Sequence, residues 1–379
     1  MNKKVKILYF VDRMLRGGIQ SLVVEIVKNI DKENFQIDFL LLDDGKTYEL
    51  EDELKEMNCN VYKLKNVWIN TPFDYIKYCK EMNKFFKTIG KDYDIVHLHS
   101  SSKNFMVLYY AQKYGIKVRI AHSHNTDFQT KNKIKILVGN CFKHFLKKYA
   151  TNYMACSKDA GKWLFGSNVQ IDILNNAIDV EKFNFSEKQR KIIRERYNIL
   201  DGDIVCGNVG RFVAQKNHQF LLDIFSSVYQ KDKRYKLLLI GSGTKEEEEK
   251  LKEIAKANQI EKAVIFAGFQ ENANLYFNAM DLFVFPSKFE GLGIVVIEAQ
   301  ANGLKCIISD NIPDEVKITK NVKAISLTDR NKWIDSILSI EKIRTNNLED
   351  INNKGYNINQ EIKKLEQYYK FEKIKKYSN

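Results

Sequence analysis

Short apolar or β-branched runs alternate with longer amphipathic runs along almost the whole chain, and this alternation constrains the fold most. In the first half the short runs cover residues 5–11, 36–42, 94–100, 118–124 and 151–157. In the second half they cover residues 204–211, 235–243, 263–268, 281–287 and 305–310. Strands that are apolar on both faces and joined by helix-length crossovers are typical of parallel sheets covered by helices. We therefore predict an α/β protein with two doubly wound, Rossmann-like units in series.

The boundary between the two units is predicted near residues 176–186, where the pattern restarts before a charged helix at 187–197. A length of 379 residues agrees with two domains. We assign residues 1–178 to an N-terminal domain and residues 179–359 to a C-terminal domain. A separate amphipathic helix is predicted over 358–377.

Targeting and disulfide signals are weak. No stretch approaches the roughly 20 apolar residues that span a bilayer. The basic start of the chain leads directly into the first apolar run, and Asp12 and Arg13 follow too soon for a signal peptide. The six cysteines lie far apart without a CxxC pair, so we expect reduced thiols in the core. Together these features predict a cytoplasmic protein.

The net charge is 61 − 48 = +13, and part of this excess is concentrated on two predicted helices. One carries Lys77, Lys80, Lys84 and Lys87 with Tyr75, Tyr78, Phe85 and Phe86; the other carries Lys131, Lys133, Lys135, Lys143, Lys147 and Lys148 with Phe142 and Phe145. A basic, partly apolar surface of this kind can rest on anionic lipid headgroups, although it can also be a plain solvated face. No recognition motif accompanies the charge, so we do not expect nucleic-acid binding.

Glycines and basic residues follow the first strand of each unit, where ligands bind in doubly wound sheets. Gly17 and Gly18 open a helix after the first strand, and a helix N-terminus offers free N–H donors to an anion. A purely structural tight turn fits this pair equally well. In the second unit, Gly210 and Arg211 are expected just past a strand, and Lys216 is expected at the start of the next helix. Arg and Lys at one strand end suit a diphosphate.

The GSG segment at 241–243 imitates a nucleotide-binding turn, but residue 246 is Glu where the dinucleotide fingerprint requires Gly. This substitution disfavours an NAD site.

The most specific segment is PSKFEGLGIVVIEAQANG, at residues 286–303. Glu290 is expected at a strand end, and Gly291, Leu292 and Gly293 place backbone amides at the start of the following helix. Glu298 is expected about one and a half turns into that helix, still within reach of a ligand. Two carboxylates there suit the vicinal hydroxyls of a sugar and a ribose. Two glutamates on a solvated helix surface would produce the same spacing.

Two His-x-His pairs, His97/His99 and His122/His124, also occur near strand ends. Residues i and i+2 of a strand share a face, so each pair could in principle bind a metal. Neighbouring Cys or carboxylate ligands are lacking, and we favour hydrogen-bonded structural roles for His97 and one of the second pair. A histidine at a strand end could instead contact a substrate hydroxyl or phosphate.

In their order along the chain, these segments resemble the retaining glycosyltransferases of family 4 (group 1), particularly bacterial enzymes of exopolysaccharide or capsule assembly. The resemblance rests on the GG pair, HSHN (122–125), CSKDAG (156–161), NAIDVEKF, GNVGRFVAQKN, LLLIGSG, VIFAGF, FEGLGIVVIEAQANG and CIISD. It implies the GT-B fold, in which two Rossmann-like domains face a cleft, with the C-terminal helix at 360–379 packed back on the first domain.

The resemblance also implies roles for individual residues. Arg211 and Lys216 would hold the donor diphosphate, Glu290 would bind the donor sugar, and Glu298 would bind the ribose. The amides of residues 291–293 would assist Glu290. The full predicted donor-binding set is Gly17, Gly18, Gly210, Arg211, Lys216, Gly241, Gly243, Phe269, Glu290, Gly291, Leu292, Gly293 and Glu298, in which Phe269 would flank the base and Gly18 would lie against the diphosphate.

His124 aligns best with the family histidine that contacts the transferred sugar, and His122 is the alternative. The predicted catalytic set is therefore His124, His122, Arg211, Lys216 and Glu290. The chain departs from the family at SDNIPDEV (309–316), where Gly-Gly-x-Pro-Glu is usual.

The implied reaction moves a sugar from a nucleoside diphosphate, by default UDP, to a hydroxyl of a glycan or polyprenyl-diphosphate-linked acceptor, with retention. No Asp-x-Asp motif is evident, so we expect no catalytic metal and no cofactor. We name no nucleophile, because family members are thought to react on one face through an oxocarbenium-like state. A nucleotide-sugar epimerase of the same fold and a non-catalytic polysaccharide-assembly protein remain alternatives.

Overall fold

The computed structural model describes residues 4–15, 17–69, 72–128, 130 and 132–377. Contacts within the chain separate two compact units. The first comprises Met1–Ala177 together with Ile358–Asn379, and the second comprises Ile178–Asn357. The second unit is thus one continuous segment inserted into the sequence of the first.

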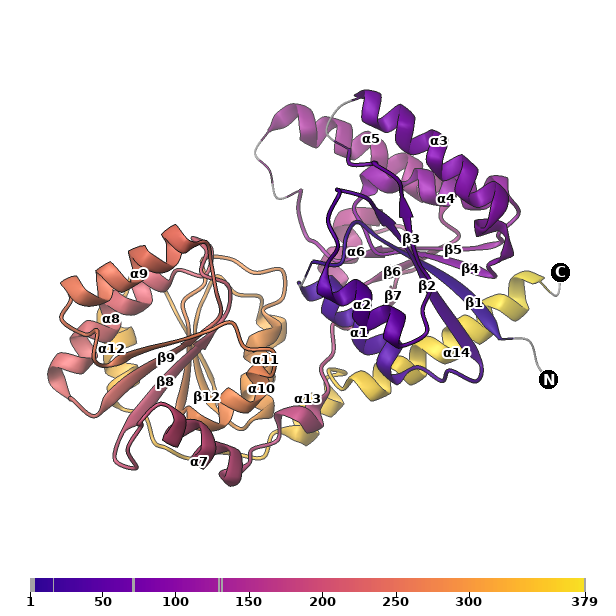
Figure 1. Cartoon of the computed structure of the whole chain (residues 1–379). Helices are drawn as coiled ribbons and strands as arrows, with labels where there is room; N and C mark the ends of the chain where they lie inside the picture. The colour runs from indigo at the N-terminus through magenta and orange to yellow at the C-terminus, as the bar shows by residue number, and fades with distance from the viewer. Residues whose placement is uncertain (1–3, 16, 70–71, 129, 131, 378–379) are drawn as a thin grey trace. The chain divides into compact units, whose positions relative to one another are not determined.

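The first unit is built on a parallel sheet with the strand order β3-β2-β1-β4-β5-β6-β7 (Figure 1). Its strands are β1 (Val5–Val11), β2 (Phe35–Leu42), β3 (Val61–Leu64), β4 (Ile95–Leu98), β5 (Val118–Ser123), β6 (Asn152–Ala155) and β7 (Asp172–Ile173). Its α-helices are α1 (Gly18–Asn29), α2 (Glu49–Glu56), α3 (Pro72–Thr88), α4 (Met106–Lys113), α5 (Lys133–Tyr149), α6 (Lys158–Phe165) and α14 (Ile358–Tyr377).

Helices cover both faces of this sheet because successive strand residues point to opposite sides. In β1, Ile7 and Tyr9 enter a core shared with α1 and α14, whereas Leu8 and Phe10 enter a second core shared with α3 and α4. Tyr369 of α14 is fully buried in the first of these cores. Helix α14 therefore belongs to the first unit, although it follows the second unit in the sequence.

The second unit repeats the design with the strand order β10-β9-β8-β11-β12-β13. Its strands are β8 (Ile204–Val209), β9 (Tyr235–Ile240), β10 (Val264–Gly268), β11 (Leu282–Phe285), β12 (Lys305–Ser309) and β13 (Val322–Ile325). Its α-helices are α7 (Glu187–Arg196), α8 (His218–Lys231), α9 (Lys245–Ala257), α10 (Ala273–Tyr276), α11 (Ile294–Ala301), α12 (Arg330–Leu338) and α13 (Leu348–Asn353).

The two Rossmann-like sheets confirm the predicted fold class. In each sheet the order of strands reverses at one point, between β1 and β4 in the first unit and between β8 and β11 in the second. Ligands of open α/β sheets bind beyond the carboxyl ends of the strands at such a point. The two reversals therefore mark where the functional side chains should be sought.

Several expectations from the sequence were wrong. Cys141 is exposed and Cys79 is half-buried, so these two thiols are not in the core. The aromatic residues predicted on the surface of the first basic helix are mostly core residues: Tyr78, Phe85 and Phe86 are buried, because they form the apolar face that α3 turns toward the sheet. The sequence pattern also missed the short strands β3, β7 and β13. Lys131 lies outside the described residues.

Among the described helices, none has the length and apolar character that a membrane span requires.

Candidate functional site

The loops after β8 and β11 lie at the strand reversal of the second unit and are tied to each other. The Lys288 amide donates to the Gln215 carbonyl at 2.9 Å, and the Gln215 side chain donates to the Phe289 carbonyl at 2.8 Å. These bonds fix the loop that carries Lys216 against the loop that carries Glu290.

Lys216 and Glu290 form the centre of this site. The Lys216 ammonium donates to Glu290 Oε1 over 2.7 Å, and both side chains are largely buried. The Ser287 hydroxyl donates to the same carboxylate oxygen at 2.5 Å. The ammonium also lies 4.9 Å from the centre of the Phe285 ring, a cation–π contact. The sequence had indicated Lys216 and Glu290 separately, but not their contact and not Ser287, whose only signal was its position three residues before Glu290.

Glycines allow the loops at this edge to approach each other. Gly241 has φ +140°, and a Cβ added there would lie 2.0 Å from the Gly210 carbonyl oxygen. At Gly243 an added Cβ would meet the Phe212 carbonyl oxygen at 2.8 Å. Residues 241 and 243 are therefore glycines because the end of β9 packs closely against the backbone of the loop after β8.

The segment before α11 presents a backbone turn beside Glu290. Gly293 is the N-cap of α11 and adopts φ +90°, a conformation that favours glycine. Gly291 is exposed, and the Leu292 side chain is buried in the core, so Leu292 can serve a ligand only through its backbone. Amides at a helix N-terminus lack internal partners and are available to an anion or a hydroxyl.

Glu298 lies on α11, and its side chain is half-buried. Burial raises the pKa of its carboxyl to about 7, and the positive charge of Lys216 opposes this shift. A carboxyl whose pKa lies near neutrality beside a lysine is typical of a functional site.

Arg211 and Phe269 complete the predicted set in the second unit. Both side chains are exposed, and Phe269 retains 55% of its accessible surface. An exposed aromatic ring at the end of β10 suits stacking on a base, and an exposed guanidinium suits a phosphate.

In the first unit, Gly17 is the N-cap of α1, and Gly18 is the first residue of that helix. A Cβ added at Gly18 would meet no atom within 4 Å. The described part of this unit therefore does not require glycine at residue 18.

His122 and His124 lie at the end of β5, next to His97 and His99 at the end of β4. His97 Nε2 and His122 Nδ1 are 3.1 Å apart, a contact between the two pairs that the sequence did not predict. His124 is half-buried and bonds to His99 Nδ1 through Nε2 at 3.1 Å. Burial holds the pKa of His97, His99 and His122 well below the usual range and lowers that of His124 to about 3. All four rings are therefore neutral.

The strand reversal of the first unit also holds a polar cluster that sequence reasoning missed. Asp12, directly after β1, accepts hydrogen bonds from the side chains of Ser100 and Asn104 and pairs with Lys103 at 3.3 Å. Its position after the first strand was the available signal.

Comparison with known proteins assigns both units. Residues 16–182 match the model "Glycosyltransferase Family 4", and residues 189–360 match "Glycosyl transferases group 1". The Bacillus subtilis (strain 168) protein named glycosyltransferase EpsF is 31% identical over 326 residues, which are 83% of this chain and 82% of that protein.

A galactosyltransferase of Escherichia coli that acts on α-D-GlcNAc-diphosphoundecaprenol, and whose name gives UDP-Gal as donor, is 24% identical over 97% of both chains. Among solved structures, Anabaena Alr3699/HepE in complex with UDP and glucose has a TM-score of 0.72 at 16% identity, covering 98% of this chain and 95% of that one. A glycosyltransferase from Rickettsia africae ESF-5 has a TM-score of 0.77 at 18% identity, covering 97% and 98%. At these identities the structures establish the fold.

Proposed function

Because this chain belongs to the glycosyltransferases of family 4 and group 1, we propose that it is a retaining enzyme that transfers a sugar from a UDP-sugar to a glycan or polyprenyl-diphosphate-linked acceptor. The observation that carries this proposal is the buried Lys216–Glu290 pair at the strand reversal of the second unit. The similarity to a transferase that acts on a diphosphoundecaprenol-linked sugar supports the lipid-linked acceptor, and relatives named for capsular polysaccharide and O-antigen biosynthesis support a role in cell-surface polysaccharide synthesis.

The predicted site residues of the second unit bind different parts of the donor in this reaction. Arg211 and Lys216 stabilise the negative charge that develops on the departing diphosphate. Glu290, already oriented by Lys216 and Ser287, accepts hydrogen bonds from hydroxyls of the transferred sugar. Glu298 binds the ribose, and Phe269 lies against the base. The positive charges of Arg211 and Lys216 replace those of a metal ion at the diphosphate.

In the first unit, His124 contacts the transferred sugar through its ring. Its Nε2 is engaged by His99, and its Nδ1 is buried without a hydrogen-bond partner among the described residues, so the ring would turn to meet the sugar. A neutral imidazole with one unused nitrogen can bond to a hydroxyl without adding charge. His122 is almost fully buried, so His124 is the better candidate.

A donor panel tests this function. We expect the purified protein to bind one UDP-sugar in preference to GDP- and ADP-sugars and to hydrolyse it slowly in the presence of EDTA. Glu290→Gln, which preserves side-chain volume, should bind UDP but lose most hydrolysis of the sugar. Release of an epimerised free sugar without acceptor would favour an epimerase, and failure to bind any donor would contradict the proposed site.

One of the two proposed acceptors is lipid-linked, and the surface of α3 and α5 suits an anionic bilayer. These helices are joined through the stacked rings of Tyr75 and Phe142, whose centres lie 6.0 Å apart. Large apolar side chains are exposed on both, namely Phe73, Ile76, Ile134, Leu137, Val138 and Phe145. Exposed lysines accompany them on each helix. Apolar insertion combined with basic charge is the usual basis of peripheral membrane binding.

Vesicle binding tests this surface. We expect the protein to sediment with vesicles that contain phosphatidylglycerol, less so at high salt, and hardly with pure phosphatidylcholine. Replacing Ile134 and Leu137 by Ser should weaken binding at least about tenfold, because each apolar side chain contributes roughly 1.5–3 kcal/mol when buried. The matched control is Leu200→Ser with Ile343→Ser, two exposed apolar residues of the second unit. Equal loss in both variants would contradict a specific surface.

A further inference from the structure

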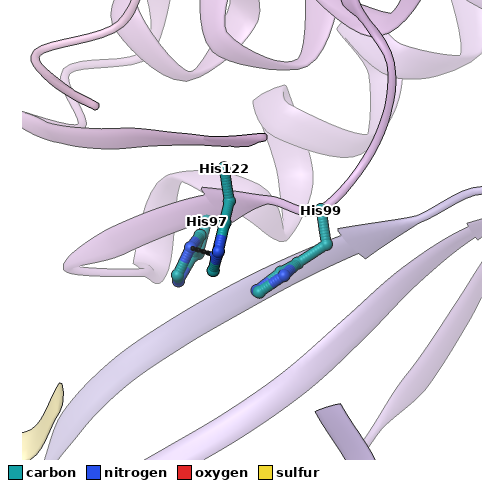
Figure 2. Close-up of side chains that lie close together, drawn as sticks. All are labelled: His97, His99 and His122. Atoms are coloured by element: carbon teal, nitrogen blue, oxygen red, sulfur yellow. Dashed lines mark hydrogen bonds between the residues drawn. The ribbon is translucent and has the colours of Figure 1, made fainter. Parts of the chain in front are cut away.

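Four histidine rings gather at the carboxyl ends of β4 and β5. The register pairs His97 with Ile120 and Leu98 with Ala121, so His99 and His122 follow at equivalent heights on neighbouring strands. Ring centres of successive members lie 4.0 Å (His97–His99), 5.0 Å (His99–His122) and 4.1 Å (His122–His124) apart. Figure 2 shows the rings of His97, His99 and His122 converging from the two strands. The fold thus joins two pairs that are separate in sequence.

The hydrogen bonds within this cluster leave ring nitrogens unused. Nε2 of His99 and Nε2 of His122 are buried and have no hydrogen-bond partner among the described residues. A buried polar atom left without a partner costs roughly 1–3 kcal/mol, so such atoms call for an explanation. Both side chains are about 1% exposed, which rules out simple solvation as that explanation.

We propose that His97, His99 and His122 form a binding site for a divalent transition-metal ion of the zinc class. One ring nitrogen of each residue lies within 4.8 Å of those of the other two. Tetrahedral Zn²⁺ with bonds of about 2.0–2.1 Å needs ligand nitrogens roughly 3.3 Å apart, so the three rings would turn toward one another on binding and a fourth ligand would come from outside the trio. Imidazole ligands suit zinc, copper, nickel and cobalt, whereas magnesium and calcium require oxygen ligands.

The surroundings of His97 are those of an oriented ligand. The Tyr369 hydroxyl lies 2.6 Å from His97 Nδ1 and 2.7 Å from the Tyr9 hydroxyl. Both tyrosines are fully buried. An Nδ1–H that donates to the Tyr369 hydroxyl would leave the lone pair on Nε2, the nitrogen that contacts His122 Nδ1 and that a metal would take over.

The proposed ion is separate from the donor chemistry. The residues assigned to the diphosphate lie in the other unit, and the EDTA experiment above concerns those residues. Since His99 also bonds to His124, a bound ion would fix the histidine that we assign to the transferred sugar. Metal binding itself does not depend on that assignment, and its test does not use turnover.

The test is a metal titration of the full chain, with any affinity tag removed and the protein first stripped with EDTA. We expect one equivalent of Zn²⁺ to bind in competition with a chromophoric chelator. Co²⁺ should show the visible absorption of a tetrahedral nitrogen site without the charge-transfer band of a thiolate, which separates this site from the exposed Cys141. His99→Gln and His122→Gln should each weaken binding at least about 100-fold, since a direct ligand exceeds the 10–100-fold of outer-shell groups.

Two further variants keep the test decisive. Tyr369→Phe deletes only a hydroxyl and should weaken Zn²⁺ binding about tenfold, as expected of a group that orients a ligand. His144→Gln removes an exposed histidine of α5 and should leave the affinity unchanged. Binding of much less than one equivalent, or an affinity that falls in His144→Gln but not in His99→Gln and His122→Gln, would overturn the proposal. In that case the cluster is a metal-free network of neutral rings.

Discussion

Replacing Lys216 by Gln is expected to lower the rate of donor turnover about 10²–10³-fold, the usual cost of removing one group that stabilises developing negative charge. Lys216 is positioned by Glu290 at 2.7 Å and by the Phe285 ring, so its charge is fixed before the donor arrives. The measurement is the release of UDP from a saturating UDP-sugar, followed together with the affinity for UDP.

A surface lysine of the same unit provides the control. Lys332→Gln on α12 removes an equal charge from an exposed position and should leave turnover within about twofold of the wild type, as surface substitutions usually do. Thermal unfolding of both variants separates lost chemistry from lost structure. Normal turnover in a folded Lys216→Gln protein would remove this residue from the mechanism.

Gly241→Ala is expected to have the largest effect on stability, about 2–3 kcal/mol. The backbone at Gly241 has φ +140°, where a side chain is strained, and the added methyl group would lie 2.0 Å from the Gly210 carbonyl oxygen. Relief requires β9 and the loop after β8 to separate. Urea unfolding of the purified variant, read as a shift in the midpoint, measures this loss.

Gly210→Ala is the matched control, because it lies on the other side of the same contact. A Cβ there would meet Lys216 carbons at 3.6 Å, an ordinary packing distance, and its φ is not in the left-handed region. Its stability should stay within about 0.5 kcal/mol of the wild type. If the two variants unfold at the same urea concentration, the close approach is not what requires glycine at 241.

The sequence predicted the two sheets because their strands are apolar on both faces, a pattern that helix-covered parallel strands share. The short strands β3, β7 and β13 were not predicted. Such strands lie at or near the sheet edges and carry too few apolar residues to display a period. Tyr78, Phe85 and Phe86 were misplaced because a dense run of aromatic and basic residues does not reveal which face meets the sheet.

The positions of Lys216 and Glu290 after strands of the second unit were predictable, but their ion pair was not. The contacts that hold them were not predictable, because Ser287 and Phe285 act through distances that spacing does not encode. The histidine cluster also depends on contacts that the sequence does not reveal. Each His-x-His pair alone offers two nitrogens, and only the pairing of β4 with β5 unites them.

The insertion of one unit into the sequence of the other determines an order of assembly during synthesis. Residues 178–357 form a continuous segment that can fold as soon as it leaves the ribosome. The N-terminal unit, although it is translated first, lacks Ile358, Ile362, Leu365 and Tyr369 of its core until the final helix emerges. During that interval only the part of this face that α14 covers stays exposed beside α1 and α2, and the first unit is completed after the second.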